Sequence, residues 1–117
     1  MWSKLEIVPE DPALNDKDVK ESLGRDSHCS VVYGKNLYIF GGYSFSQGLY
    51  LNEIIKVNLE KIEEGKATFK SIKTNSAKIP QPRSNFASCI LSDNLYIFGG
   101  TNSLEFFEDF WRFNCTK

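Results

Sequence analysis

The sequence is poor in the residues that build metal centres and acid–base sites. It contains one histidine, His28, and three cysteines, so a histidine-rich zinc or copper shell cannot be assembled within the chain. A catalytic triad or a cysteine–histidine pair would each depend on that single histidine. We therefore expect no catalytic residue, no metal and no cofactor, and we do not expect this chain to be an enzyme.

Long apolar runs and an excess of positive charge are also missing. No stretch approaches the ~20 apolar residues that a membrane-spanning helix needs, and the first residues lack the apolar centre of a signal peptide. The formal net charge is −1, which provides no general attraction to nucleic acid or to an anionic membrane. Neither a nucleic-acid partner nor a membrane partner is therefore expected.

The three cysteines, Cys29, Cys89 and Cys115, are odd in number and irregularly spaced. No two of them take equivalent positions in the repeat described below, so a disulfide framework is not indicated. Reduced thiols are typical of proteins in the cytoplasm and nucleus. We expect a cytoplasmic location, with the nucleus as the alternative.

What the sequence does contain is an internal repeat. The hexapeptide Leu-Tyr-Ile-Phe-Gly-Gly occupies residues 37–42 and returns, identical at all six positions, at residues 95–100. After the glycines, residues 53–58 match residues 109–114 at an offset that is two residues smaller, so the intervening loop is shorter in the second copy. Since insertions and deletions belong in loops, this slip supports a structural repeat.

Each copy divides into short strands. A first strand with alternating apolar residues leads through a tight turn into the Leu-Tyr-Ile-Phe run, which is apolar on both faces. A third strand follows the loop, and the first copy continues into a fourth. Four short antiparallel strands, with central strands covered on both faces, are typical of a β-propeller blade. The expected strands span residues 28–33, 37–40, 53–59 and 67–73 in the first copy, and 86–91, 95–98 and 109–114 in the second.

The residues around these strands resemble the Kelch family. Its repeat carries a double glycine after an apolar strand, followed by an acidic residue and an aromatic residue in the next strand. The resemblance implies an all-β fold of Kelch-type β-propeller blades, each with four antiparallel strands, of which the chain would hold about two in an incomplete ring. The repeat signature consists of Arg25, Gly41, Gly42 and Glu53 in the first copy, and of Arg83, Gly99, Gly100, Asp109 and Trp111 in the second.

The same resemblance implies a division of the chain. Residues 1–7 would be the fourth strand of a preceding or closing blade, and residues 8–24 a loop. Residues 25–74 would form a complete blade, 75–82 a linker loop, and 83–117 a blade that lacks its fourth strand. Two blades cannot close a ring, and each would leave an apolar face bare. The remaining blades would come from a longer chain or from self-association.

Arg25 and Arg83 admit two interpretations. They could act as a pair of cationic ligands for a bound group. Alternatively, each could donate a fork of hydrogen bonds to backbone carbonyls or to the acidic residue of the third strand, Glu53 or Asp109. Their presence in both copies favours the structural role, because a specific ligand site would rarely be duplicated. For His28, whose place is taken by a phenylalanine in the second copy, a position at the blade edge is likewise the simpler interpretation.

The loops after the glycines differ between the copies, which makes them better candidates for partner binding. Exposed aromatic side chains on loops are typical of binding surfaces. In the alternative interpretation, part of these side chains merely extends the third strand into the sheet. We expect Tyr43 and Phe45 to be more exposed than Tyr38 and Phe40. The candidate partner-binding residues are Tyr43, Phe45, Leu49, Tyr50 and Phe106.

The Kelch resemblance implies a non-catalytic protein–protein interaction module, a scaffold or an adaptor, with a protein as its partner. The sequence does not choose among partners. The alternative is that the chain forms part of a propeller enzyme of the galactose oxidase type, since a Kelch-type propeller can carry a copper centre. This chain by itself lacks the ligand set of such a centre.

Overall fold

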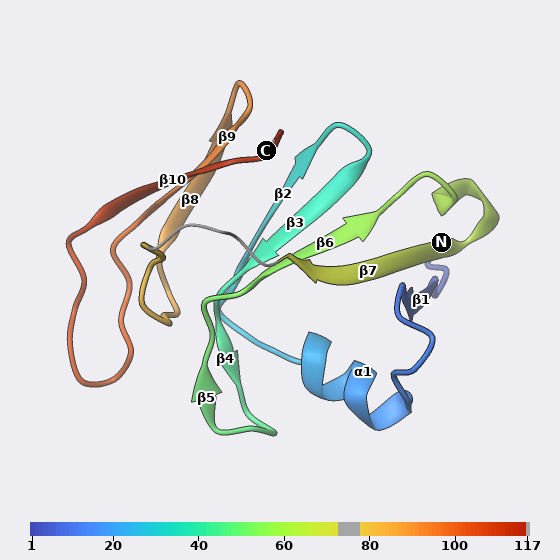
Figure 1. Cartoon of the computed structure of the whole chain (residues 1–117), viewed down its shortest axis with the longest axis horizontal. Helices are drawn as coiled ribbons and strands as arrows, with labels where there is room; N and C mark the ends of the chain where they lie inside the picture. The colour runs from blue at the N-terminus through green and yellow to red at the C-terminus, as the bar shows by residue number, and fades with distance from the viewer. Residues whose placement is uncertain (73–77, 117) are drawn as a thin grey trace.

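Short β-strands dominate the structure, a computed structural model that describes residues 1–72 and 78–116 (Figure 1). No helix within these residues is long and apolar enough to cross a membrane. The strands are β1 (Glu6–Pro9), β2 (Cys29–Tyr33), β3 (Asn36–Phe40), β4 (Tyr43–Ser44), β5 (Leu49–Tyr50), β6 (Ile54–Asn58), β7 (Lys66–Ile72), β8 (Ala87–Leu91), β9 (Asn94–Phe98) and β10 (Phe110–Asn114). The helices are α1 (Asp16–Leu23) and the 3₁₀ turn η1 (Ile62–Glu64).

The first repeat folds as one four-stranded antiparallel unit. Strands β2, β3, β6 and β7 lie side by side in that order, and each pairs antiparallel with the next. The tight turn between β2 and β3 places Gly34 at φ 62°, a left-handed conformation that glycine adopts without steric cost. We refer to this unit as blade 1.

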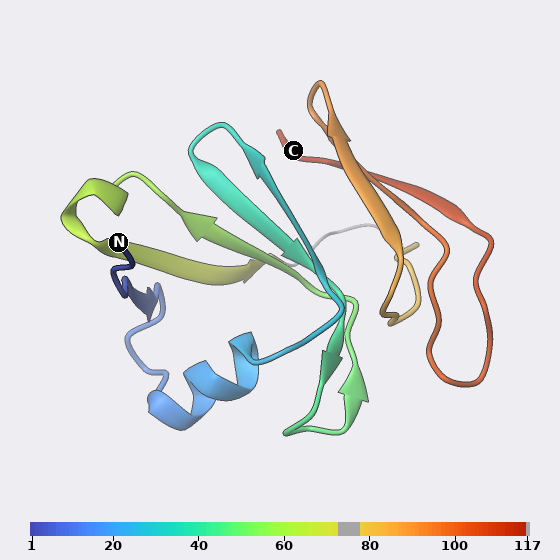
Figure 2. The same ribbon diagram turned by 180° about the vertical axis from the view of Figure 1, so that it is seen from behind.

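The second repeat forms blade 2, a three-stranded antiparallel sheet in the order β10-β9-β8. Figure 2 shows the two blades standing next to each other without closing into a ring. The predicted fold class, Kelch-type blades of antiparallel strands in an incomplete ring, is therefore confirmed.

The N-terminal segment differs from the prediction. Strand β1 begins at Glu6, within the end of the expected 1–7 strand, and pairs in parallel with the outer strand β7 of blade 1. It is not a neighbour of β10, the strand it would accompany in a closing blade. The expectation of a loop over residues 8–24 is wrong in its second half, because α1 forms there.

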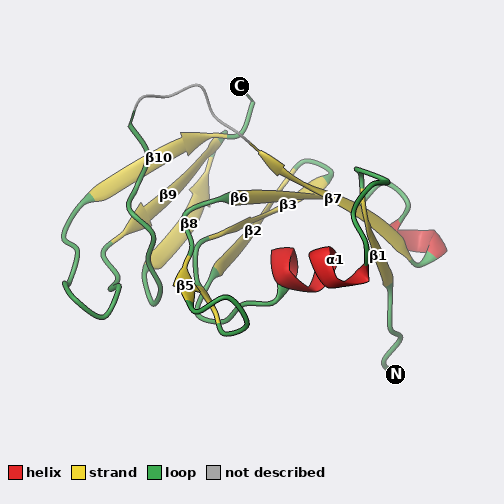
Figure 3. Ribbon diagram, turned by 60° about the horizontal axis from the view of Figure 1, so that its bottom comes forward, coloured by secondary structure: helices red, strands yellow, loops and turns green. Residues whose placement is uncertain are grey.

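Helix α1 forms because its start is capped and one side is apolar. The Asn15 side chain accepts a hydrogen bond from the Asp18 amide (2.9 Å), and the Asp18 carboxylate accepts one from the Asn15 amide (3.2 Å), a reciprocal capping box. Val19 and Leu23, four residues apart, share one side of the helix. Both pack on a buried cluster of blade 1, so α1 covers one face of that sheet (Figure 3).

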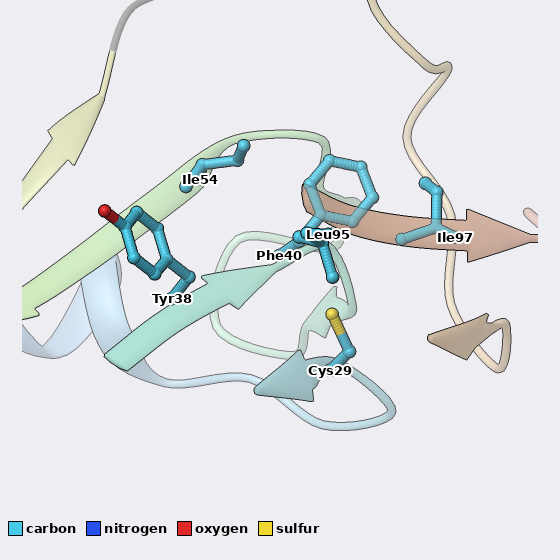
Figure 4. Close-up of a cluster of buried hydrophobic side chains, with 6 residues drawn as sticks. All are labelled: Cys29, Tyr38, Phe40, Ile54, Leu95 and Ile97. Atoms are coloured by element: carbon cyan, nitrogen blue, oxygen red, sulfur yellow. The ribbon is translucent and has the colours of Figure 1, made fainter. Parts of the chain in front are cut away.

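The apolar core lies in two clusters on opposite faces of blade 1. The cluster under α1 contains Ile55, Val57, Ala67 and Phe69. The second cluster fills the space between the blades, where side chains from both sheets point toward one another (Figure 4). Blade 1 is thus covered on both faces, and the prediction of a bare apolar face on each blade is wrong for blade 1. The interblade cluster consists of Cys29, Tyr38, Phe40, Ile54, Leu95 and Ile97.

Hydrogen bonds also join the blades. The Tyr33 hydroxyl donates to the Asp93 carboxylate (2.6 Å), and the Tyr38 hydroxyl donates to the Cys115 carbonyl (3.3 Å). The Gly42 amide donates to the Arg83 carbonyl (2.8 Å). Apolar packing and backbone bonding together fix blade 2 against blade 1.

The outer face of blade 2 lacks such cover. We call it the open face, formed by Leu91, Tyr96, Phe98 and Phe110. Phe98 is 51% exposed and Phe110 is 68% exposed, whereas Phe40, the equivalent of Phe98 in blade 1, is 3% exposed. The prediction of a bare apolar face is therefore confirmed for blade 2, because the described residues place no third layer on this side.

Candidate functional site

Arg83 lies at the centre of a buried hydrogen-bond network in blade 2. Its guanidinium donates to both carboxylate oxygens of Asp109 (2.6 and 2.9 Å) and to the Gly99 carbonyl (2.9 Å). The group is fully buried and lies over the Phe107 ring, 4.1 Å from its centroid. The Trp111 indole donates to the same carboxylate (2.7 Å). Arg83 therefore binds the strands of its own blade together.

Arg25 takes the equivalent place in blade 1. It donates to the Glu53 carboxylate (2.8 Å), to the Gly41 carbonyl (3.0 Å) and to the Ser22 carbonyl at the end of α1 (2.6 Å). Its side chain is buried, and these acceptors occupy it. In this structure both arginines serve the fold, which is the structural alternative of the two considered from the sequence.

The Arg83 fork sets the charge state of Asp109. Hydrogen bonding from Arg83 is the main cause that lowers the pKa of Asp109 from 3.8 to about 2, and the Trp111 indole adds to it, while partial burial opposes the shift. Asp109 is therefore a carboxylate at neutral pH. A group held in this state by two donors stabilises the blade and is poorly suited to accept a proton in a reaction.

The double glycine is required for close packing. A Cβ on Gly41 would lie 2.9 Å from the Phe86 ring and 3.0 Å from the Arg83 carbonyl, both in the neighbouring blade. A Cβ on Gly42 would lie 2.5 Å from the Asp26 carbonyl of its own blade. These contacts leave no room for a side chain, so the pair serves blade packing in this structure.

His28 and the cysteines do not gather into a site in the part of the chain that the structure describes. His28 is exposed, while Phe86 at the equivalent position packs edge-on against Phe40 with ring centroids 5.5 Å apart. All three cysteines are free thiols, and burial raises the pKa of the Cys29 thiol. No group of three or more potential metal ligands occurs among the described residues.

Two loops project from the same end of the blades and carry exposed apolar side chains. One is the hairpin of β4 and β5, and the other spans residues 101–107; Figures 1 and 2 show both extending on the side where α1 lies. We call their apolar side chains the loop surface. It consists of Phe45 (90% exposed), Leu49 (53%), Leu104 (92%) and Phe106 (90%).

Both loops are held in place by internal bonds. The hairpin is closed by antiparallel pairing of Tyr43 with Tyr50, whose rings meet edge-on at 4.9 Å between centroids. In the second loop, the Asn102 side chain accepts hydrogen bonds from two successive backbone amides (3.1 Å each). The Tyr50 and Ser103 hydroxyls form a hydrogen bond that ties the two loops together. The loop surface is therefore positioned by the fold.

Comparison with known protein families identifies the family to which this repeat belongs. A family profile described as the KLHDC2/KLHL20/DRC7 Kelch-repeats domain matches residues 2–117. The chain belongs to the Kelch-repeat family. The repeat signature identified from the sequence includes the arginines, glycines and acidic residues whose contacts are described above.

Related Kelch proteins match part of the chain. Kelch domain-containing protein 3 is 37% identical over 79 residues in Rattus norvegicus, covering 68% of this chain and 19% of that protein. Tip elongation aberrant protein 1 of Schizosaccharomyces pombe is 28% identical over 91 residues, covering 78% of this chain and 8% of that protein. Host cell factor 2 of Homo sapiens is 30% identical over 82 residues, covering 65% of this chain and 9% of that protein. This Kelch chain matches less than a fifth of the length of each of these relatives.

The loops of this Kelch chain only partly match the residues predicted from the sequence. Tyr43 is half-buried and Phe45 exposed, against the buried Tyr38 and Phe40, so the predicted order of exposure is confirmed. Tyr50 is half-buried against Tyr43. Leu104 was missed, although the shorter second loop and its lack of a match in the first copy are the signals that could have singled it out.

Proposed function

We propose that the chain is a non-catalytic protein–protein interaction module, a scaffold or adaptor whose protein partner binds the loop surface. One observation carries the proposal: four large apolar side chains, each more than half exposed, lie on two loops that a hydrogen bond ties together. Exposed apolar groups on ordered loops mark sites where a partner can displace water.

For partner binding, the fixed conformation of the loops matters as much as their apolar side chains. Association costs free energy for every side chain and loop that becomes ordered on binding. Here the hairpin pairing and the Asn102 bonds have already fixed the backbone that carries Phe45 and Phe106. A partner would therefore gain from burying these rings without ordering the loops first.

We further propose that another Kelch blade covers the open face of blade 2. The contact between blades 1 and 2 supplies the pattern, since Phe86 packs on Phe40 and the Arg83 carbonyl accepts from the Gly42 amide. Phe98 and Gly100 hold the equivalent positions at the open face. The limited share of the relatives that the chain matches is consistent with further blades. The three free thiols support a cytoplasmic or nuclear location.

Site-specific photocrosslinking in cells tests the loop surface as the binding site. A photoreactive phenylalanine analogue is placed at Phe45 or at Phe106, and we expect each to give the same discrete crosslinked partner. The matched control carries the analogue at Lys35, an exposed residue in the turn between β2 and β3 at the other end of blade 1. It should give no crosslink to that partner.

The controls separate a binding surface from general reactivity. Crosslinks of equal strength from Phe45, Phe106 and Lys35 would indicate nonspecific contact and would overturn the proposal. The absence of any discrete product from both loop positions, with a folded protein by circular dichroism, would also overturn it.

A further inference from the structure

The two loops have a charge pattern that accompanies their apolar side chains. Residues 43–55 and 101–111 contain no lysine and no arginine, although the chain as a whole has 14 such residues. The same two segments contain four acidic residues, Glu53, Glu105, Glu108 and Asp109. The two segments that bear the loop surface are therefore acidic, even though the whole chain is almost neutral.

Only part of this acidic charge is neutralised within the fold. Arg25 pairs with Glu53 and Arg83 pairs with Asp109, both beneath the loops. Glu105 and Glu108 are exposed, and neither forms an ion pair within residues 1–72 and 78–116. Two unpaired carboxylates thus flank Phe106, whose backbone pairs with that of Thr101 where the second loop closes.

The same pattern extends to the first loop. Asp26 is exposed, and its backbone pairs with that of Tyr43 at the base of the hairpin. Acidic side chains therefore lie at the base of one loop and on the other, with the apolar groups Phe45, Leu49 and Leu104 beside them. An apolar surface with an acidic border attracts a complementary partner and repels one of like charge.

We propose that the partner segment that binds the loop surface is both apolar and basic. Its leucine or aromatic side chains would cover Phe45 and Phe106, and its arginine or lysine side chains would pair with Glu105 and Glu108. This inference rests on the proposed function, because it specifies the partner of the same surface. Acidic segments bind poorly, since they bring like charges together at the border of the apolar patch.

Fluorescence anisotropy with three matched peptides tests the partner chemistry on the intact chain. The first peptide combines leucine, phenylalanine and arginine in a serine–glycine background. The second has glutamate in place of arginine, and the third has serine in place of leucine and phenylalanine. We expect the first to bind at low salt, the second to bind about tenfold more weakly or worse, and the third to show no measurable binding.

Variants assign the discrimination to named residues. The E105Q/E108Q double variant should bind the basic and acidic apolar peptides with affinities that differ by no more than about twofold. The F45S/F106S variant should lose both. The control is Leu91→Ser on the open face of blade 2, which should change neither affinity, because the open face is a separate apolar surface.

Each result decides a separate point. Equal binding of the basic and acidic peptides by the unaltered chain overturns the inferred partner chemistry while leaving the loop surface as a binding site. Preference for the basic peptide that persists in E105Q/E108Q also overturns it. Loss of binding in L91S but not in F45S/F106S would place the peptide on the open face and contradict the proposed function itself.

Discussion

At the scale of single residues, the repeated arginine and its acidic partner show how one ion pair organises a blade. The Arg83 guanidinium reaches Asp109, the residue just before β10, and the Gly99 carbonyl, just after β9. A planar fork with several donors can make these bonds at once, which a lysine ammonium could not reproduce. The duplication of this arrangement in Arg25 and Glu53 explains why both copies keep the pair.

Asp109 is expected to make the stability of the chain sensitive to acid. The folded pKa, about 2, lies below the ordinary value of 3.8, so the folded state binds the proton less readily than the unfolded state. The resulting stabilisation is complete above about pH 4 and is lost as the pH falls toward 2. It contributes about 1–2 kcal/mol after allowance for solvent screening of the partly exposed carboxylate.

Urea unfolding of the wild type and of Asp109→Asn between pH 2 and pH 6 measures this contribution. The difference between the two free energies of unfolding should be largest near pH 6 and should shrink as the pH falls toward 2. A difference that stays constant over this range would show that the Asp109 carboxylate is not specially stabilised. Other carboxylates titrate equally in both proteins and cancel in the comparison.

The ion pairs were predictable from sequence because both partners recur in register with the repeat. The loop surface was only partly predictable. Phe45 follows the double glycine in an unmatched segment, so its exposure could be expected. The mutual packing of Tyr43 and Tyr50, in contrast, depends on a hairpin formed by two strands of only two residues each. No local sequence pattern predicts that pairing, because strands of two residues are too short to show an alternation of apolar and polar residues.

At the scale of elements, β3 and β9 have the same Leu-Tyr-Ile-Phe sequence but different surroundings. In β3 the Tyr38 and Phe40 side chains face blade 2 and are buried. In β9 it is Leu95 and Ile97 that are buried against blade 1, and Phe98 lies on the open face. Identical strands thus bury opposite sets of side chains, because each has a neighbouring blade on a different side.

Truncation of the equivalent phenylalanines should reveal this difference. Phe40→Ala should lower the free energy of unfolding by about 3–5 kcal/mol, as expected for a buried aromatic residue. Phe98→Ala should lower it by only about 1–2 kcal/mol, because half of that ring is in contact with water. The identical sequences of β3 and β9 would by themselves predict equal costs, and the exposure of Phe98 corrects that expectation. Equal losses in chemical denaturation would mean that the open face is covered in solution.

Helix α1 was not predicted, and the reason lies in its composition. Only Val19 and Leu23 supply an apolar side in eight residues, which is too few to establish a helical period against a background of charged residues. The Asn15 and Asp18 capping box was a usable start signal. Pro9 and Pro12, which precede it, are typical of loops and favour the opposite interpretation.

At the scale of the whole molecule, the fold class was predictable from the sequence, but which blade faces are covered by other segments was not. A repeat of six identical residues with turn signals and Kelch signature positions determines the blade. Which blade faces remain bare depends on the position of segments outside the repeat. The N-terminal arm, formed by β1 and α1, covers blade 1. The open face of blade 2 is therefore the single bare apolar face among the described sheets.

The isolated chain is expected to associate through the open face. Its apolar side chains should draw molecules together as the protein concentration rises. Sedimentation velocity over a range of concentrations should show an increase in average mass, and Phe98→Ser together with Phe110→Ser should reduce it. A wild-type chain that remains monomeric at all concentrations would contradict the expectation.

The state that forms also distinguishes two arrangements. A ring of three copies would require blade 2 of one copy to pack on the face of blade 1 that α1 occupies. Contacts between two open faces require no such displacement and close after two copies. We therefore expect a dimer as the first associated species. A discrete trimer would show that α1 gives way to a neighbouring blade.

The cover that α1 gives to blade 1 has a consequence for the order of events on the ribosome. The residues that shield the α1-covered face of blade 1 are synthesised before the strands they protect, so that face is shielded as soon as its sheet forms. The face toward blade 2 waits only for the residues that are translated next. At every stage the unprotected apolar surface therefore belongs to the blade that was made last. This surface lies next to the emerging chain, so the segment that is translated next is the first one to contact it.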